Sequence, residues 1–536
     1  MKKLYINGKI YVDKEHFEES MLISDGIIVA LGTNEELMEH EADEVVDLLG
    51  KTMLPGLNDS HLHLTMMGDY MNTCNLTSAK SIDEVVRLGE KFLAEHPDTK
   101  VLIGKGWNQN SFQEGERRFI NRHDLDRIST DIPIVFDRVC IHVSVGNTKA
   151  LEILNIDETT KIEGGEIQLG ADGKPNGIFN EGAVKLIQSV IPPKSAENIS
   201  RDFIRAMDYA VSVGLTSVQS CDVMSKDFEK VFNAIDNIVK DDKLKFRYSH
   251  QFNFQDIEDF KAYLRSEHLY GVYDEKMYYK GALKLFKDGS LGARTALMST
   301  GYNDAPDETG VDALDDDKLY ELCKLAHENN IRVLIHAIGD KAIQSVIDVY
   351  EKLIDDKDNI LRHGIVHNQI TTKAQLEKIA ELGLTVMYQP IFLLSDIAII
   401  NDRVGDELEK TSYAFNSLYQ MGAPVSLSTD APVEDCNPFE NIYVAVNRMR
   451  FDFTPQGGYF KEECMSVSDA IDSYTIKSAY LEGKEDFKGR LKPGFVADMV
   501  ILDRDIFTID KTEIKDIKVV ETIVGGNTVY KSSCAK

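Results

Sequence analysis

Two histidines spaced by one residue, His61 and His63, close a short apolar run that begins at Leu54. Side chains alternate along a β-strand with a period of two, so both imidazoles point to the same face and can bind one metal ion. An isolated His-x-His pair is more often a chance pair on a surface strand. The pair therefore indicates a metal site only if further ligands are found elsewhere in the chain.

Four further candidates lie at or near the ends of other predicted strands. They are Lys284, His336, His367 and Asp430. Each alone has a simpler interpretation, because a single histidine is often a hydrogen-bonded core residue and an aspartate in this position can cap the helix that follows. Together, four histidines, one lysine and one carboxylate at strand ends favour a metal centre.

Lys284 is an unusual member of this set, because a protonated amine repels a cation and an unpaired lysine is rarely buried. Nearby metal ions lower the pKa of such an amine, and the neutral form can add carbon dioxide to give a carbamate. This two-oxygen anion can bridge two metal ions. Lys287 competes for the role, but in an unbroken strand it points to the opposite face, so we expect a surface or loop residue there.

Eight apolar segments alternate with amphipathic helical segments such as residues 318–329 and 372–382. The strand candidates are residues 54–64, 215–220, 245–252, 281–287, 332–337, 364–368, 385–389 and 425–429. This alternation predicts an α/β protein with a parallel (β/α)8 TIM-like barrel. In such a barrel the carboxyl ends of the strands carry the chemistry, so the six candidate ligands would meet at one mouth.

Both ends of the chain read as short strands with turns, and neither end has enough strands for a closed core. We expect residues 1–56 and 488–536 to pair into a small composite β-sandwich, and residues 57–487 to form the barrel. The interval from about 70 to 200 is too long for one crossover, which predicts an inserted subdomain after the first strand.

Composition limits the class of partner. The 536 residues carry a formal net charge of −29, which argues against nucleic acid or an anionic membrane surface as a partner. The seven cysteines include no Cys-x-x-Cys pair, and no apolar stretch has the length of a membrane span. We expect a cytoplasmic protein that acts on a small-molecule substrate, with a homodimer as the candidate assembly.

Several motifs carry a family resemblance over nearly the whole chain. They are the segments 54–63, 104–109, 284–296, 336–340, 428–432 and 494–498. With them the chain resembles the metal-dependent amidohydrolase superfamily, specifically the YtcJ-like branch (amidohydrolase family 3) that includes N-substituted formamide deformylases. The resemblance implies His61 and His63 on one metal ion, His336 and His367 on a second, carbamylated Lys284 between them, and Asp430 as a ligand and proton shuttle. The sixth strand departs from the family's Ile-Glu-His-Ala pattern and reads Ile365-Val366-His367-Asn368, with His363 upstream as a second candidate ligand.

This ligand set predicts a metal-dependent hydrolase that cleaves a non-peptide carbon–nitrogen bond of a small molecule through a metal-activated hydroxide. The expected cofactors are one or two divalent ions, zinc before iron or manganese, and carbon dioxide as the lysine carbamate. Deaminase and esterase or lactonase chemistry on the same scaffold are alternatives, and Gly339-Asp340 replaces the glutamate that a deaminase would carry there. A catalytically inactive regulatory or binding protein is the alternative of another class.

Substrate contacts are expected from loops and from the inserted subdomain. The candidates are Trp107, Arg138, His142, Glu181, Asp288, Ser290 and Arg294. Trp107, the only tryptophan, can equally be a core aromatic of the subdomain. Arg138 and Arg294 can hold an anionic group with two hydrogen bonds each, or can form structural ion pairs.

Overall fold

The computed structural model describes residues 1–14, 16–138, 143–162, 165–224, 228–271, 273–354 and 358–533. The chain folds as two compact units, residues 1–67 with 199–536, and residues 68–198. Within the described ranges, no helix is both long enough and apolar enough to cross a membrane.

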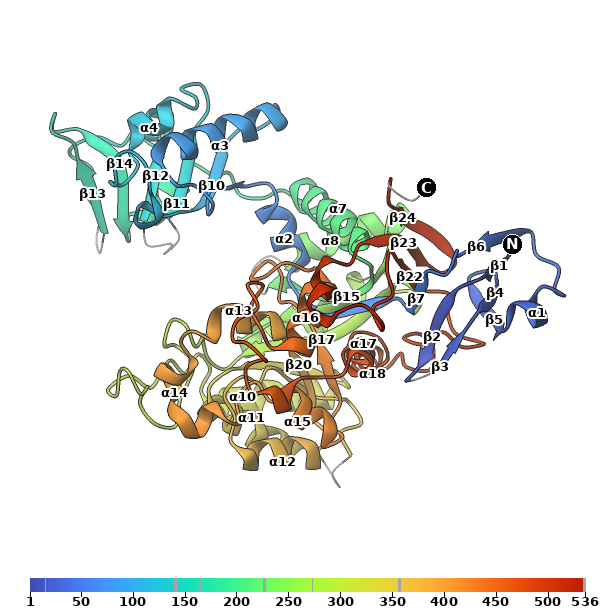
Figure 1. Ribbon diagram of the computed structural model, residues 1–536. Helices are drawn as coiled ribbons and strands as arrows, with labels where there is room; N and C mark the ends of the chain where they lie inside the picture. The colour runs from blue at the N-terminus through green and yellow to red at the C-terminus, as the bar shows by residue number, and fades with distance from the viewer. Residues whose placement is uncertain are drawn as a thin grey trace. The chain divides into compact units, whose positions relative to one another are not determined.

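The larger unit is built around an eight-stranded parallel sheet (Figure 1). In sheet order its strands are β8 (Leu57–Leu62), β15 (Leu215–Met224), β16 (Arg247–Asn253), β17 (Tyr278–Phe286), β18 (Val333–Ala337), β19 (Gly364–His367), β20 (Thr385–Tyr388) and β21 (Val425–Leu427). All seven neighbouring pairs are parallel. The predicted TIM-like barrel is therefore confirmed, and each of the eight expected segments supplies one strand.

The barrel is nearly closed where its first and last strands meet. At the end of β8 and just after β21, the backbone N–H of Asp430 donates to the carbonyl of His61 over 3.0 Å, and the N–H of His63 donates to the carbonyl of Ala431 over 2.7 Å. These two bonds lie at the carboxyl ends of the strands. The closure therefore joins the His61–His63 segment directly to the segment that carries Asp430.

Amphipathic helices follow most of the strands, and their buried residues recur at helical spacing. In α11 (Asp340–Leu353) the buried side chains include Ile343, Val346, Ile347 and Tyr350. Side-chain caps start α10 (Asp316–Glu328) and α12 (Lys373–Glu381). The other helices of this unit are α1 (Asn34–Leu37), α8 (Phe228–Lys240), α9 (Ile257–Ser266), α13 (Leu393–Asp396), α14 (Ile400–Glu409), α15 (Phe415–Gln420), α16 (Pro438–Asn447), α17 (Val467–Tyr474) and α18 (Ile476–Glu482). Helices α2 (Leu64–Tyr70) and α7 (Ala196–Ser212) lead into and out of residues 68–198.

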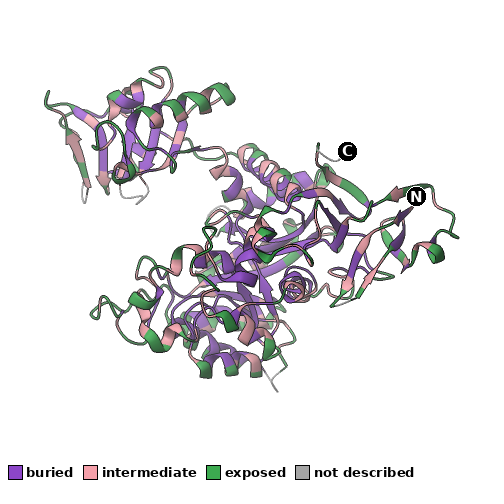
Figure 2. Ribbon diagram, in the orientation of Figure 1, coloured by how far each residue is buried: buried purple, intermediate pink, exposed green. Residues whose placement is uncertain are grey.

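The barrel strands are buried along most of their length (Figure 2). One apolar cluster joins four of them to α18, through Ala282, Leu334, Val366, Met387 and Leu481. Each of the four strand residues belongs to a different strand, β17 to β20, so the cluster fixes these strands against one another.

The two ends of the chain share one β-structure, in agreement with the expected composite sandwich. One sheet runs β24 (Asn527–Lys531), β23 (Val519–Val524), β22 (Met499–Leu502), β7 (Thr52–Pro55), β2 (Lys9–Asp13) and β3 (His16–Glu18). The other runs β5 (Ile27–Gly32), β4 (Ser20–Ser24), β1 (Lys2–Ile6) and β6 (Glu44–Asp47). Strand β7 pairs with β22, and a shared core includes Tyr5, Met53 and Ile501. Strand β7 leads through Gly56 straight into β8, so the sandwich holds the base of the first barrel strand.

Residues 68–198 form a unit with its own mixed sheet. Its strand order is β13 (Gly165–Leu169), β14 (Pro175–Glu181), β12 (Val143–Gly146), β11 (Ile134–Arg138), β10 (Leu102–Trp107) and β9 (Cys74–Asn75). Helices α3 (Ile82–Glu95), α4 (Arg122–Asp126), α5 (Thr148–Ile153) and α6 (Val184–Gln188) belong to it. Two apolar clusters, around Phe136 and around Phe179, give it a core of its own.

Candidate metal centre

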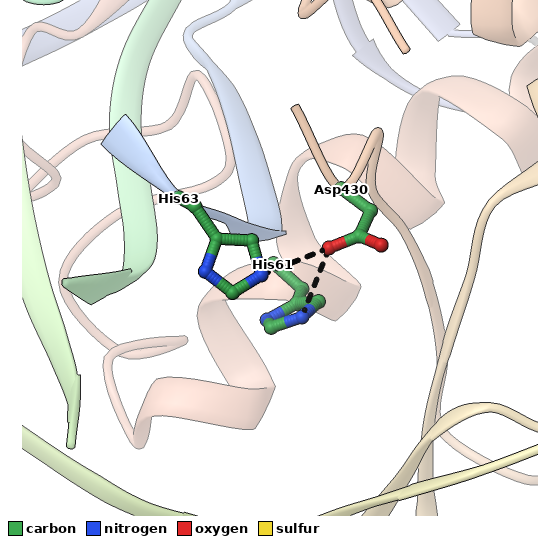
Figure 3. Close-up of side chains that lie close together, drawn as sticks. All are labelled: His61, His63 and Asp430. Carbon is green, nitrogen blue, oxygen red and sulfur yellow. Dashed lines mark ion pairs between the residues drawn. The ribbon is translucent and has the colours of Figure 1, made fainter. Parts of the chain in front are cut away.

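Three predicted ligands meet where the first and last barrel strands close (Figure 3). His61 lies in β8, His63 follows that strand, and Asp430 follows β21. The Nε2 atoms of the two histidines lie 3.3 and 3.2 Å from the same carboxylate oxygen, Oδ1 of Asp430. Their candidate ligand atoms all lie within 4.8 Å of one another, which is a spacing that one divalent ion can span.

The other predicted ligands lie beside this group. The rings of His336, in β18, and His367, in β19, are 4.3 Å apart between centroids, and the ring of His367 is 6.0 Å from that of His61. Lys284, in β17, is fully buried, and its amine lies 3.8 Å from the ring centroid of Phe286 without a hydrogen-bond partner among the described residues. The structure thus brings all six predicted ligand residues to one end of the barrel.

Unusual backbone conformations place two of these side chains. His367 has a φ of 79° and Asp430 a φ of 57°, both in the left-handed region that non-glycine residues rarely adopt. Such strain persists only where surrounding contacts hold it, and it clusters at functional sites. At Asp430 the holding contact is its backbone hydrogen bond to His61.

Each of the four histidines uses one ring nitrogen in a hydrogen bond to a neutral oxygen. Nδ1 of His61 lies 2.5 Å from Oε1 of Gln251, Nδ1 of His63 lies 2.9 Å from the carbonyl of Cys221, Nδ1 of His367 lies 2.7 Å from Oε1 of Gln389, and Nε2 of His336 lies 3.0 Å from the carbonyl of Gly289. A carbonyl or amide oxygen only accepts, so each of these nitrogens carries the proton. In the neutral rings of His61, His367 and His336 the other nitrogen then has a free lone pair, Nε2 in the first two and Nδ1 in His336. Nε2 of His63 lies against the Asp430 carboxylate.

The electrostatics of the centre also suit a cation. Burial lowers the pKa of His61 to about 4 and that of His336 to about 3, which keeps both imidazoles neutral. Burial also lowers the pKa of the Lys284 amine to about 8. Burial alone would raise the pKa of Asp430, but the adjoining His61 and His63 hold it well below its usual range, so the carboxylate is ionised. For His63 the effect of burial is outweighed by Asp430, which raises its pKa.

Three buried polar atoms in the centre have no hydrogen-bond partner among the described residues. They are Nε2 of His61, Nζ of Lys284 and Oδ1 of Asp430. His61 and Asp430 are close, but their geometry does not make a hydrogen bond. Buried polar groups are costly when they are left unsatisfied. The neutral imidazoles of His61 and His336, an anionic carboxylate and buried polar atoms without a hydrogen-bond partner together fit a divalent metal ion.

Asn58 and Asp59 directly precede the histidine pair in the sequence. Asp59 accepts hydrogen bonds from the backbone N–H of His61 and from both the N–H and the hydroxyl of Thr429. Burial raises the pKa of Asp59 to about 7. Asn58 instead donates to Glu482 at 2.5 Å, so of the two only Asp59 supports the metal-facing segments.

Three predicted substrate contacts lie after β17, and two of them have structural partners instead. Asp288 is buried and accepts hydrogen bonds from the backbone N–H groups of Leu297, Ile338 and Gly339, so its carboxylate holds two loops together. Arg294 forms a two-bond ion pair with Asp304, which is the structural alternative for this arginine. Ser290 is exposed, and its backbone bonds to Thr295.

The remaining substrate candidates lie in residues 68–198. Trp107 is fully buried in the core of this unit and donates its indole N–H to the carbonyl of Phe136 over 3.1 Å, which favours the core interpretation. Arg138 donates to Gln109 and to Asn108. Glu181 ends β14 and is exposed. His142 lies outside the described residues.

Two competing assignments can be examined in the structure. His363 accepts a hydrogen bond from the N–H of Val333 at Nδ1, and its Nε2 lies 3.0 Å from Nδ1 of His327, so neither nitrogen is available to a metal ion. Lys287 follows β17 in a loop, as expected, but it is not at the surface. Its amine is fully buried and pairs with Asp312 and Asp316, both at 2.7 Å, because two carboxylates compensate the buried charge.

Sequence reasoning did not identify the residues that orient the histidines. Gln251 and Gln389 are both buried, and each contacts one imidazole. A glutamine within or directly after a buried barrel strand was the available signal, because such a side chain needs a polar partner in the interior.

Comparison with known proteins identifies a family and several relatives. A model of the amidohydrolase family matches residues 44–530. The chain is 31% identical over 540 residues to the protein YtcJ of Bacillus subtilis, covering 99% of this chain and 100% of that protein. It is 26% identical over 537 residues to an N-substituted formamide deformylase of Arthrobacter pascens, covering 96% and 95%.

A solved structure is similar over almost the same length. The crystal structure of an uncharacterized metal-dependent hydrolase from Pyrococcus horikoshii matches with a TM-score of 0.78 and 30% identity, covering 95% of this chain and 99% of that one. The similarity therefore includes the barrel, the terminal strands and residues 68–198 together.

Proposed function

The chain belongs to the amidohydrolase family, and from this premise we propose that it is a metal-dependent hydrolase that cleaves an amide-type, non-peptide carbon–nitrogen bond in a small molecule. One observation carries the proposal. Histidines, an ionised carboxylate and a buried amine converge at the carboxyl ends of the barrel strands, and three of their polar atoms have no hydrogen-bond partner in the part of the chain that the structure describes. Such a set is costly to bury unless a cation completes it.

We assign the candidate ligands to two sites. His61 and His63 would hold one divalent ion and His336 and His367 a second, and Asp430 and Lys284, whose charges act on histidines of both pairs, would contribute to both sites. Zinc suits imidazole and carboxylate donors, and iron or manganese could replace it. A divalent ion bound here supplies Lewis-acid chemistry, since it lowers the pKa of water and polarises the oxygen of a scissile carbonyl.

Lys284 would contribute as a carbamate. Burial lowers its pKa to about 8, so a useful fraction of the amine is neutral near physiological pH. In the modification, Nζ forms a bond to the carbon of carbon dioxide and releases one proton. The product would be an anion with two oxygens, which would remove the cost of an unpaired buried amine and add oxygen donors to the centre.

Asp430 would move the proton. Its carboxylate is ionised, and Oδ1 faces the histidine pair. It would accept a proton from the attacking water and pass it to the leaving nitrogen, which a carboxylate in contact with both groups can do. Neutral His61 and His336 do not compete for that proton, because burial disfavours their charged forms.

The substrate proposal rests partly on similarity. An N-substituted formamide deformylase aligns with 96% of this chain, which makes N-substituted formamides the first substrates to test. The deaminase alternative gains no support from Asp340, because this residue bonds the backbone N–H and the hydroxyl of Ser299.

The test combines metal content with turnover of a substrate panel. The purified protein would be assayed by elemental analysis and offered N-substituted formamides, N-acyl amines, carbamates, hydantoins and esters. We expect one or two equivalents of divalent metal, and turnover of at least one carbon–nitrogen substrate that is abolished by chelation. Esters as the only substrates would favour the esterase or lactonase alternative. Stoichiometric metal without any turnover would favour a catalytically inactive binding protein.

A further inference from the structure

Two glutamines that no motif singled out are built against the candidate metal centre. Gln251 lies in β16 and Gln389 directly follows β20, and only 1% and 2% of their surfaces are exposed. Gln251 contacts Nδ1 of His61, and Gln389 contacts Nδ1 of His367. Each glutamine therefore contacts one of the two candidate histidine pairs, the first being His61 with His63 and the second His336 with His367.

The orientation of each amide is fixed by groups that cannot donate. Nε2 of Gln251 donates to the carbonyl of Ser60 over 2.9 Å, and Nε2 of Gln389 donates to the carbonyl of Met387 over 2.9 Å. Because a backbone carbonyl only accepts, the NH2 end of each amide must face it and the oxygen must face the imidazole. Gln389 has a second anchor, since its Nε2 also lies 2.7 Å from the hydroxyl of Ser428.

We propose that Gln251 and Gln389 are positioning residues that hold His61 and His367 in the Nδ1-protonated tautomer, so that each ring presents a bare Nε2 to a metal ion. The inference rests on the metal centre proposed above. It follows from the direction of the hydrogen bonds, because an acceptor-only oxygen at Nδ1 requires the ring proton to be there. A hydrogen bond at Nδ1 also fixes the plane of the imidazole ring. A metal ligand needs a fixed ring plane as well as a free lone pair.

Both glutamines are uncharged, and this affects the expected metal affinity. An amide oxygen orients the imidazole without adding negative charge, whereas a carboxylate in the same position would make the ring a stronger donor and attract the cation. Replacing the carboxamide by the thioether of methionine would remove the oxygen that orients the imidazole ring. Substitution by glutamate and substitution by methionine should therefore change metal affinity in opposite directions.

Gln389 is the better position for this comparison. In a Gln389→Glu variant the new oxygen that faces Met387 can accept a hydrogen bond from the hydroxyl of Ser428, which compensates part of the repulsion from the carbonyl. Among the described residues the NH2 group of Gln251 has one anchor, the carbonyl of Ser60, so a glutamate there would place a second acceptor against that carbonyl without a compensating donor. At position 251 we therefore use only Gln251→Met, as a second test of whether removing the amide oxygen lowers metal affinity.

The first measurement is zinc affinity by competition with a chromophoric chelator. We expect Gln389→Met and Gln251→Met to bind zinc about 10- to 100-fold more weakly than the wild type, and Gln389→Glu to bind at least as tightly. Gln420→Met is the matched control, because Gln420 lies at the end of α15 and bonds Asn416 at the surface. Equal weakening by methionine and glutamate at position 389, or unchanged affinity in both methionine variants, would overturn the proposal.

The second measurement needs no metal. Nitrogen-15 spectra of the histidine rings in the metal-free protein report which ring nitrogen is protonated, and the signal of His367 is assigned by its change in Gln389→Met. We expect the Nδ1-protonated form in the wild type and its loss in the variant. An Nε2-protonated His367 in the wild type would refute the inference. If the wild type binds no zinc, the proposed function fails, while these spectra still decide the role of the glutamines.

Discussion

Asp59 and Thr429 connect the first and last strands of the barrel directly beneath the candidate metal centre. The hydroxyl of Thr429 donates to Oδ2 of Asp59 over 2.6 Å, and its backbone N–H lies 3.2 Å from the same oxygen. Asp59 also accepts the N–H of His61. One buried carboxylate thus sets the distance between the segment that carries the histidine pair and the segment that carries Asp430.

Removing the hydroxyl at position 429 should loosen this connection. In Thr429→Val the buried oxygen of Asp59 loses its shortest hydrogen bond, which costs about 1–3 kcal/mol of unfolding free energy. We expect a lower melting temperature and faster release of metal to a chelator. Thr429→Ser keeps the hydroxyl and should behave like the wild type, so a similar loss in both variants would show that the hydroxyl is not the cause.

Asp430→Asn should separate metal binding from turnover. The asparagine keeps an oxygen near His61 and His63 but cannot accept the proton of water, so we expect most of the bound metal to remain while turnover falls about 10²- to 10⁴-fold. Metal content and kcat on the best substrate of the panel check this. Near-normal turnover would contradict the role of Asp430 in proton transfer.

Lys284→Ala should lose both activity and bound metal. The variant removes the amine that would carry the carbamate and leaves a space beside Phe286 at the buried end of β17. A short carboxylic acid such as acetate, added at high concentration, can place two oxygens in that space, and we expect it to restore part of the metal content. Full metal occupancy in the variant without acid would rule out the assignment of Lys284.

Glu434→Gln should change how stability depends on pH. Burial, followed by the charges of Asp396, Glu440 and Asp435, raises the pKa of Glu434 to about 7, above its unfolded value near 4.5. Its contribution to stability is therefore fully present below about pH 4.5 and is lost as the pH rises towards 7. Because the side chain is partly solvated, we expect a difference of about 1 kcal/mol.

The measurement is urea unfolding of the wild type and Glu434→Gln from pH 4 to pH 8. The variant should lose less stability than the wild type between pH 4.5 and 7, because the glutamine does not ionise. Parallel curves over this window would mean that Glu434 does not titrate with a raised pKa. Glu407→Gln, an exposed position, is the control.

Much of the barrel could be predicted from the sequence because its signals are local. Strands such as Val333–Ala337 are apolar apart from the candidate ligand His336, and α11 shows its buried residues at helical spacing, so strand and helix can both be read from the sequence. The carboxyl ends of parallel strands must meet at one end of a barrel. The sequence alone therefore predicts that His336 and His367 lie beside His61.

The partners of these residues could not be predicted, because they depend on side-chain packing between distant segments. Gln251 is 190 residues from His61, and no spacing rule connects them. Asp288 has a motif position next to the lysine strand, yet its oxygens are used by backbone N–H groups of two other segments. Lys287 illustrates the same limit, since its burial depends on Asp312 and Asp316 in a later loop.

The pairing of β7 with β22 joins the strand that precedes the histidine pair to a strand that is synthesised late. A nascent chain carries His61 and His63 early, but the strand that anchors the base of β8 is Met499–Leu502, near the other end of the sequence. Such long-range pairing closes late, because its loop entropy must be overcome first. A partly translated chain that ends before Asp430 therefore presents the two histidines without their carboxylate neighbour, and we expect the candidate centre to assemble only after almost the whole chain has been synthesised.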